Sequence, residues 1–243
     1  MRSFFGLLAL MLPPVAVLSQ QPAPAPAPPA TQLTLDLGFV DASGNSNVTS
    51  FNLGEQFTWR LDRLTLGQTA KALYGEAEKK TTAEAYDAGV RGDYSLSKTI
   101  SAFALVTFQR NPFAGIAERW GYGPGIAVAL VRSARDTLSL EGAFTGQSER
   151  NTANVRQSFG ATRTAASFKH LFTTAVAFTQ TLVWIANLKT SDDQRVTSET
   201  ALTAPLSKQI ALRVSYLIRF DNLPEPGFVK TDRLLTTGAQ ISF

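Results

Sequence analysis

Apolar and polar residues alternate one by one in about a dozen separate segments of this chain. In the clearest segment, residues 210–220, one face carries only apolar and aromatic side chains, whereas the other face includes Arg213 and Arg219. Such alternation predicts β-strands, and two arginines opposite an apolar face predict a polar interior and a lipid-facing exterior. Alternation alone does not decide which face is inside, so a soluble periplasmic β-sandwich is the alternative fold.

The turns between these segments fall into two alternating kinds. The longer kind is predicted near residues 43–47, 76–81, 111–115, 148–154, 189–194 and 221–228. The shorter kind is predicted near residues 61–62, 96–97, 133–136, 168–170 and 206–207. Six longer and five shorter turns give about 12 antiparallel strands with both chain ends on one side, which is typical of up-and-down β-barrels in bacterial outer membranes.

The chain ends on a strand whose apolar residues alternate as far as the last residue, Phe243. A closed barrel pairs such a strand and leaves no edge exposed, which a soluble sheet seldom achieves. The last eight residues also look like the closing-strand signal by which bacterial outer-membrane barrels are recognised for assembly. We assign that signal to Gly238, Ile241 and Phe243, and we expect the barrel-assembly machinery to be a partner of this strand.

The first residues predict export rather than folding. Residues 1–19 have a charged start, a short apolar stretch and small residues near Ser19, as in a cleaved secretory signal peptide. Residues 20–32 form a Pro/Ala-rich linker, which leaves 33–243 for the barrel. The chain has no cysteine, and after residue 20 no apolar run is long enough for a spanning helix. The net charge of +4 is too small to predict nucleic-acid binding.

A few residues conflict with a simple barrel pattern. Glu55 falls on the lipid-facing side of its strand, where a charge is costly. Pro124 lies in mid-strand and predicts a β-bulge. Alternation is weak in residues 154–167, and its phase puts Arg163 outward near the inner boundary.

Several segments resemble the YdiY-like family of salt-induced outer-membrane proteins, which is defined by a domain of unknown function. They are residues 44–47, 73–76, 113–116, 195–206 and 216–232, with the stretch from Arg195 to Thr203 the most specific. The resemblance spans about residues 33–243 and implies an outer-membrane β-barrel. It implies no catalytic residues, because the family has none to carry over.

Strand phase places a set of charged side chains on the inner face of the predicted barrel. Their signs nearly balance, so two interpretations stay open: a pore lining that selects solutes by charge, or an ion-paired plug that fills a non-conducting barrel. These residues are Asp36, Lys71, Asp87, Arg91, Asp93, Arg119, Glu141, Glu199, Arg213 and Arg219.

The shorter turns and their flanks are rich in cations. They carry Arg60, Arg63, Lys98, Arg132, Arg135, Lys169 and Lys208 against only Asp62 and Asp136. One hypothesis is that they lie against anionic phospholipid headgroups, which makes outer-membrane lipid a partner. The alternative is that they only keep the turns soluble.

Catalysis has little support. The single histidine, His170, is predicted on a shorter turn, away from the outer half of the barrel where a Ser–His pair would be needed. One histidine and no cysteine predict neither a metal site nor a cofactor. We therefore expect a non-enzymatic protein for passive passage of small solutes or with a structural, stress-linked envelope role. The alternative is a plugged barrel that binds a small molecule or acts as a barrel-mouth hydrolase.

Overall fold

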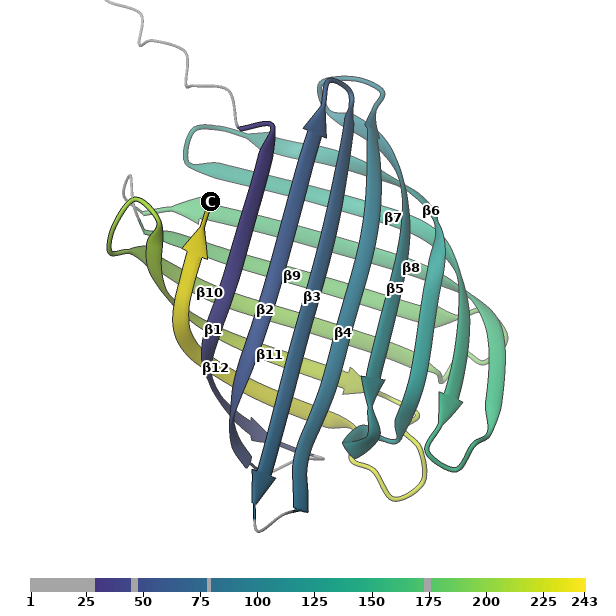
Figure 1. Ribbon diagram of the computed structural model, residues 1–243. Coiled ribbons are helices and arrows are strands. Elements are labelled where there is room, and N and C mark those ends of the chain that lie inside the picture. The colour runs from purple at the N-terminus through teal and green to yellow at the C-terminus, as the bar shows by residue number, and fades with distance from the viewer. Residues whose placement is uncertain (1–28, 45–47, 78–79, 173–175) are drawn as a thin grey trace, which may run out of the picture.

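A computed structural model describes residues 29–44, 48–77, 80–172 and 176–243, so the expected signal peptide lies outside the described residues. The described chain forms twelve strands and one 3₁₀-helix, η1, at Pro112–Ala114 (Figure 1). The strands are β1 Thr31–Ser43, β2 Val48–Leu61, β3 Leu64–Ala77, β4 Lys80–Ser95, β5 Ile100–Asn111, β6 Ile116–Arg132, β7 Asp136–Asn151, β8 Arg156–Leu171, β9 Ala177–Asn187, β10 Gln194–Pro205, β11 Ile210–Asp221 and β12 Thr231–Ser242.

Each strand pairs antiparallel with its neighbours in the chain, and β1 pairs with β12 to close a barrel. The C-terminal residue takes part in this closure, because Phe243 N donates to Leu33 O at 2.8 Å and Leu33 N donates to Phe243 O at 3.1 Å. At the same seam Gly38 lies opposite Gly238, and a Cβ atom on Gly238 would lie 2.0 Å from the carbonyl oxygen of Leu37. Glycine at 238 therefore permits the two strands to approach closely.

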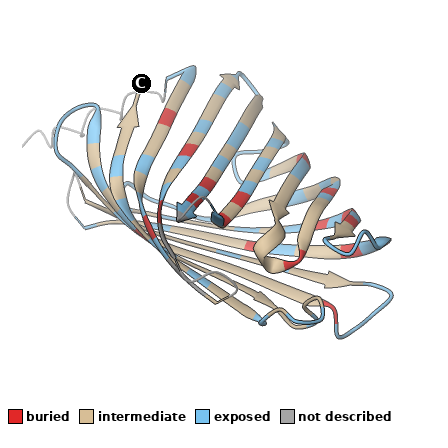
Figure 2. Cartoon of the chain, turned by 60° about the horizontal axis from the view of Figure 1, so that its bottom comes forward, coloured by how far each residue is buried: buried red, intermediate tan, exposed pale blue. Residues whose placement is uncertain are grey.

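The predicted alternation appears as two chemically different faces. The outward face exposes large apolar side chains on nearly every strand, and buried residues occur only as short bands along the wall (Figure 2). Exposed aromatic residues gather toward both ends of the strands, which is typical of the two lipid–water boundaries. They include Phe39, Phe51, Tyr74, Trp120 and Tyr122 near the longer turns, and Trp59, Tyr94, Phe172 and Phe243 near the shorter ones.

The inward face holds what hydrophobic core there is. One cluster joins Val40, Leu73, Ala83 and Ala85, with Leu234 packed against it. A second joins Phe103, Leu105 and Ala143 on another part of the wall. Because these clusters are small and separate, most of the interior between them is lined by polar side chains.

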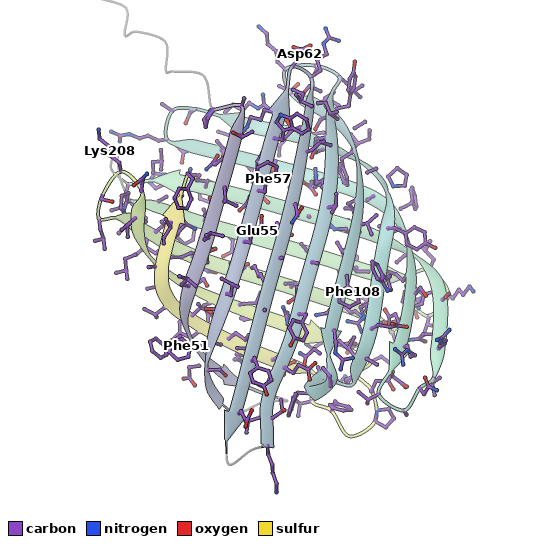
Figure 3. The ribbon with its side chains drawn as sticks, viewed as in Figure 1. Phe51, Glu55, Phe57, Asp62, Phe108 and Lys208 are labelled. Carbon is purple, nitrogen blue, oxygen red and sulfur yellow. The ribbon has the colours of Figure 1, made fainter. Side chains whose placement is uncertain are left out.

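The structure confirms the outward position of Glu55, whose Oε2 accepts a hydrogen bond from Gln68 Nε2 at 3.3 Å on the same face (Figure 3). Two other expectations were wrong. Pro124 pairs with Ala104 of β5, and the register with β7 is the same on both sides of it, although Gly123 and Pro124 themselves have no partner in β7; the register shifts of β6 lie near its two ends instead. Strand β8 continues to Leu171, so the turn expected at 168–170 comes after that residue.

Arg163 was also misplaced, because its strand has a different phase from the one expected. Phe159, Ala161 and Ala165 are buried on the inward face, and Arg163 shares their side of β8. Its Nη1 donates to Glu141 Oε2 at 2.9 Å. Within the described part of the chain, no helix is long and apolar enough to cross a membrane.

Candidate functional site

The candidate site is the charged lumen of the barrel. Seven of the expected residues line its cavities directly: Asp36, Lys71, Asp87, Arg119, Glu199, Arg213 and Arg219. The other three, Arg91, Asp93 and Glu141, lie in the same strand phase as the buried inward residues of β4 and β7. The expected residues thus share the inner surface of the barrel. Ion pairs and hydrogen bonds join most of them into three groups, which are described in turn below.

At the middle level, two ion pairs cross the lumen. Lys71 Nζ on β3 lies 3.0 Å from Glu199 Oε2 on β10, and Arg219 Nη2 on β11 lies 2.6 Å from Asp87 Oδ2 on β4. Four strands separate the two members of each pair on one side of the ring and six on the other, so each pair joins nearly opposite walls. Arg213 adds a second cation to Glu199 at 2.8 Å.

Two cavities meet at this level. The inner cavity has a volume of about 310 Å³ and extends toward the shorter turns past Asp36, Arg213 and Gln240. The outer cavity has a volume of about 360 Å³ and extends past Arg119 toward the longer loops. Both share the wall residues Thr69, Lys71, Asp87, Glu199, Leu217 and Arg219. The two cross-lumen ion pairs therefore lie where the cavities adjoin.

A second group of charges lies against the wall between β4 and β8. Arg91 contacts Asp93 at 2.7 Å and Glu141 at 2.8 Å, and its guanidinium stacks 3.8 Å from the centre of the Phe103 ring. Glu141 also binds Arg163. Each carboxylate here contacts at least one guanidinium, so the ion pairs connect β4 to β7 and β7 to β8. The two arginines and two carboxylates leave no net charge on this part of the lumen wall.

The third group closes much of the outer end. Arg119 and Arg195 both contact Glu149 and Asp221, and Arg195 Nη2 lies 3.1 Å from Asp193 Oδ1. The side chains of Glu149 and Asp193 are each only 8% exposed, whereas that of Asp221 is 25% exposed, and the cluster lines a cavity of about 270 Å³.

Four members of this outer cluster were missing from the sequence-derived set: Glu149, Asp193, Arg195 and Asp221. Strand β7 continues through Glu149 as far as Asn151, although a turn was expected from residue 148. Arg195 lies at the start of β10, beside another expected turn. Strand phase counted outward from Glu141 and Glu199 would have found Glu149 and Arg195.

The loop between β11 and β12 lies over this outer cluster. Asn151 Nδ2 donates to Glu225 Oε2 at 2.8 Å, and Asn222 N donates to Gln194 O at 2.9 Å. Phe228 packs so close to Gly115 that a Cβ atom there would lie 2.9 Å from its ring. The loop is therefore fastened to β7, to β10 and to the segment after η1.

At the inner end, the barrel seam is held by Gln240, whose Nε2 donates to Asp36 Oδ1 at 2.9 Å. His170 lies near the inner end of β8, where its Nδ1 is 2.7 Å from Asp136 Oδ1 and its ring packs edge-on against Phe172. Among the described residues, no three or more His, Cys, Asp or Glu side chains are grouped to hold a metal ion.

These observations define a closed, antiparallel transmembrane β-barrel with the fold of outer-membrane channels, so the sandwich alternative is wrong. The sequence model of the family described as "Protein of unknown function, DUF481" matches residues 35–243, and the chain belongs to this family. The family resemblance seen in the sequence is thereby confirmed. A comparison with curated proteins found no significant match.

Three solved channels illustrate the fold. The NanC porin is 8% identical, covers 85% of this chain and 98% of its own, and has a TM-score of 0.59. The COG4313 outer membrane channel from Pseudomonas putida F1 is 13% identical, with 93% and 100% covered and a TM-score of 0.52. The KdgM porin is 10% identical, with 86% and 99% covered and a TM-score of 0.51. At such low identities the similarity concerns the fold alone.

Proposed function

We propose that this protein is a non-enzymatic outer-membrane channel for the passive passage of small polar solutes. The carrying observation is that two lumen cavities share one level of the wall, and that the ion pairs Lys71–Glu199 and Asp87–Arg219 cross the lumen at that level. Outer-membrane barrels have polar interiors, and their passage is set by the pore radius and by the groups that line it.

The central ion pairs are suited to a constriction that a solute can pass. Half of the Lys71 side chain is exposed to the lumen, and its partner Glu199 keeps a second cation, Arg213, when Lys71 moves away. A polar solute can replace one partner of the pair with its own hydrogen bonds. Because three cations face three anions among Asp36, Asp87, Glu199, Lys71, Arg213 and Arg219, the inner cavity has no strong preference for one sign.

Swelling of proteoliposomes in a graded series of uncharged sugars tests this function. We expect wild-type protein to admit the smallest sugars and to exclude the larger ones. The variant Lys71→Ala/Arg219→Ala should admit larger sugars, because both cross-lumen pairs are then lost. The matched control Lys80→Ala/Arg110→Ala removes two cations outside the central level and should behave as wild type. If neither the wild type nor the central variant admits any sugar, the proposal is wrong.

The second candidate is a closed barrel with a structural, stress-linked envelope role. It is favoured by the largely buried ion pairs of Arg119, Arg195 and Glu149 beneath the fastened loop. A strain that lacks the protein should then grow poorly under high salt, and the variant Lys71→Ala/Arg219→Ala should restore its growth fully. A channel whose passage matters for growth predicts that this widened variant changes the phenotype.

A further inference from the structure

The shorter turns repeat one pattern that channel function does not explain. At each of four turns, the last outward-facing side chain of the preceding strand or turn is aliphatic, and a cation follows it within two to four residues along the chain. The apolar members are exposed, most strongly Leu206 at 72% and Leu96 at 54%. We call this set the inner rim; its pairs are Leu61 with Arg63, Leu96 with Lys98, Val131 with Arg135, and Leu206 with Lys208.

The rim cations have no ion-pair partner among the described residues, although acids are abundant elsewhere. Asp62 and Asp136 are the acids in the described turns of this end, and Asp136 is held by His170 at 2.7 Å. At the other end, by contrast, Arg110 pairs with Glu84 and Arg150 with Glu118. The inner rim therefore carries four cations against Asp62, whereas the outer end combines ion pairs with cations such as Lys80 and Lys189 that have none among the residues the structure describes.

The geometry places these cations at the depth of lipid headgroups. Asp62 and Lys208 lie on turns at the end of the barrel where the chain terminates, and Lys208 extends away from the wall (Figure 3). Trp59, Tyr94 and Phe243 are exposed at the same end and mark the boundary of the hydrocarbon region. The turns keep the cations near this boundary, because two residues separate β2 from β3, three separate β6 from β7, and four lie in each of the turns after β4 and β10.

The other cations at this end do not face the lipid. Arg132 and Lys169 lie opposite Thr137 in the neighbouring strand ladders, and Thr137 has the inward phase of Glu141, so both cations border the mouth of the lumen. Arg60 is hydrogen-bonded to Pro29 O at 3.0 Å. Among the cations at this end, those of the inner rim combine an outward aliphatic neighbour with the lack of an ion-pair partner in the described residues.

We propose that the inner rim is a binding surface for anionic phospholipids of the inner leaflet. Each aliphatic residue would contact acyl chains while the neighbouring cation binds a lipid phosphate, as in other interfacial sites. A soluble anion would use the cations alone and would gain nothing from the exposed leucines. The repeated pairing therefore favours lipid as the occupant, and the inference does not depend on whether the lumen conducts.

Native mass spectrometry of the full-length barrel, with phosphatidylglycerol and phosphatidylcholine supplied in equal amounts, tests the inference. Wild-type protein should retain phosphatidylglycerol in preference to phosphatidylcholine. The variant Arg63→Gln/Lys98→Gln/Lys208→Gln should weaken that retention on the order of ten-fold or more, since each cation near an anionic surface contributes roughly a five-fold effect. The control Lys80→Gln/Arg156→Gln/Lys189→Gln removes three exposed cations from the outer end and should retain the lipid as wild type does.

Two further arms separate the lipid from a free anion and from a folding defect. Leu96→Ser/Leu206→Ser should also weaken retention, and inorganic phosphate should not displace the lipid. Heat-modifiable gel migration reports folding, and the double variant Lys98→Gln/Lys208→Gln serves if the triple variant does not fold. The inference is overturned if wild type shows no preference, if the outer control loses as much lipid as the inner variant, or if inorganic phosphate displaces the lipid.

Discussion

The two ends of this barrel are built from the same strands but use charge in opposite ways. At the outer end, Arg119 and Arg195 are nearly enclosed by carboxylates, and the loop from β11 to β12 is fastened above them. At the inner end the turns are shorter, and their cations have exposed aliphatic neighbours and no acidic partners among the described residues. Charges that face one another hold walls together, whereas charges left single are available to a partner outside the barrel.

This difference assigns separate tasks to the two ends. At the outer end, ion pairs join the strands and hydrogen bonds hold the loop after β11, so changes there should alter both stability and passage. The inner end holds the start of β1 and the C-terminal Phe243, which are hydrogen-bonded to each other, so changes there should alter assembly and contact with the membrane.

The largest effect should come from the end of the chain. Phe243→Ala, or a short polar extension after Phe243, removes the exposed aromatic side chain that ends the closing strand beside Leu33. We expect the amount of heat-modifiable barrel in the outer membrane to fall by about ten-fold if the aromatic end is an assembly signal. His170→Ala, at the same end, should assemble normally; equal losses in the two variants would contradict the assignment.

The next effect should be on stability at the outer end. Arg195→Met removes the guanidinium from Asp193 and one of the two guanidiniums from Glu149, both largely buried carboxylates, which should lower the free energy of unfolding by about 3 kcal/mol. Lys169→Gln at the inner mouth removes an exposed, unpaired cation and should change the free energy of unfolding by less than about 0.5 kcal/mol. Urea unfolding in detergent micelles measures both, and similar losses would remove the contrast between the two ends.

A smaller effect is expected on passage. Shortening residues 223–229 removes the hydrogen bond between Asn151 and Glu225 and uncovers the outer cluster. Single-channel conductance should rise by about two-fold, because the outer opening widens while the central level is unchanged. Glu225→Ala alone breaks the hydrogen bond but keeps the loop, and it should raise the conductance less. An unchanged conductance in both variants would show that the loop does not restrict the path.

Much of this architecture could be predicted from the sequence, because period-2 alternation decides locally which face a strand residue occupies. The twelve strands, the pairing of the last strand with the first, and the inward direction of Arg213 and Arg219 all follow from this rule. Arg163 was misplaced because its strand has little polar contrast and turns a large aromatic residue, Phe159, into the lumen.

The partners of the lumen charges could not be predicted. Lys71 and Glu199 are 128 residues apart, and Asp87 and Arg219 are 132 apart. Which residues meet across a barrel depends on strand number and stagger together, and neither is encoded in one strand. The outer cluster was missed for a related reason, since strand ends next to long loops have no sharp signal in the sequence.

The central claim is that the two lumen cavities form one passage narrowed by Lys71–Glu199 and Asp87–Arg219. Conductance across planar bilayers tests this claim most directly, with wild-type protein compared with Lys71→Ala/Arg219→Ala. We expect steady openings from the wild type and openings about two-fold larger from the variant, because the narrowest level is then wider. Silence from both proteins across several preparations would contradict the claim and would identify the barrel as closed.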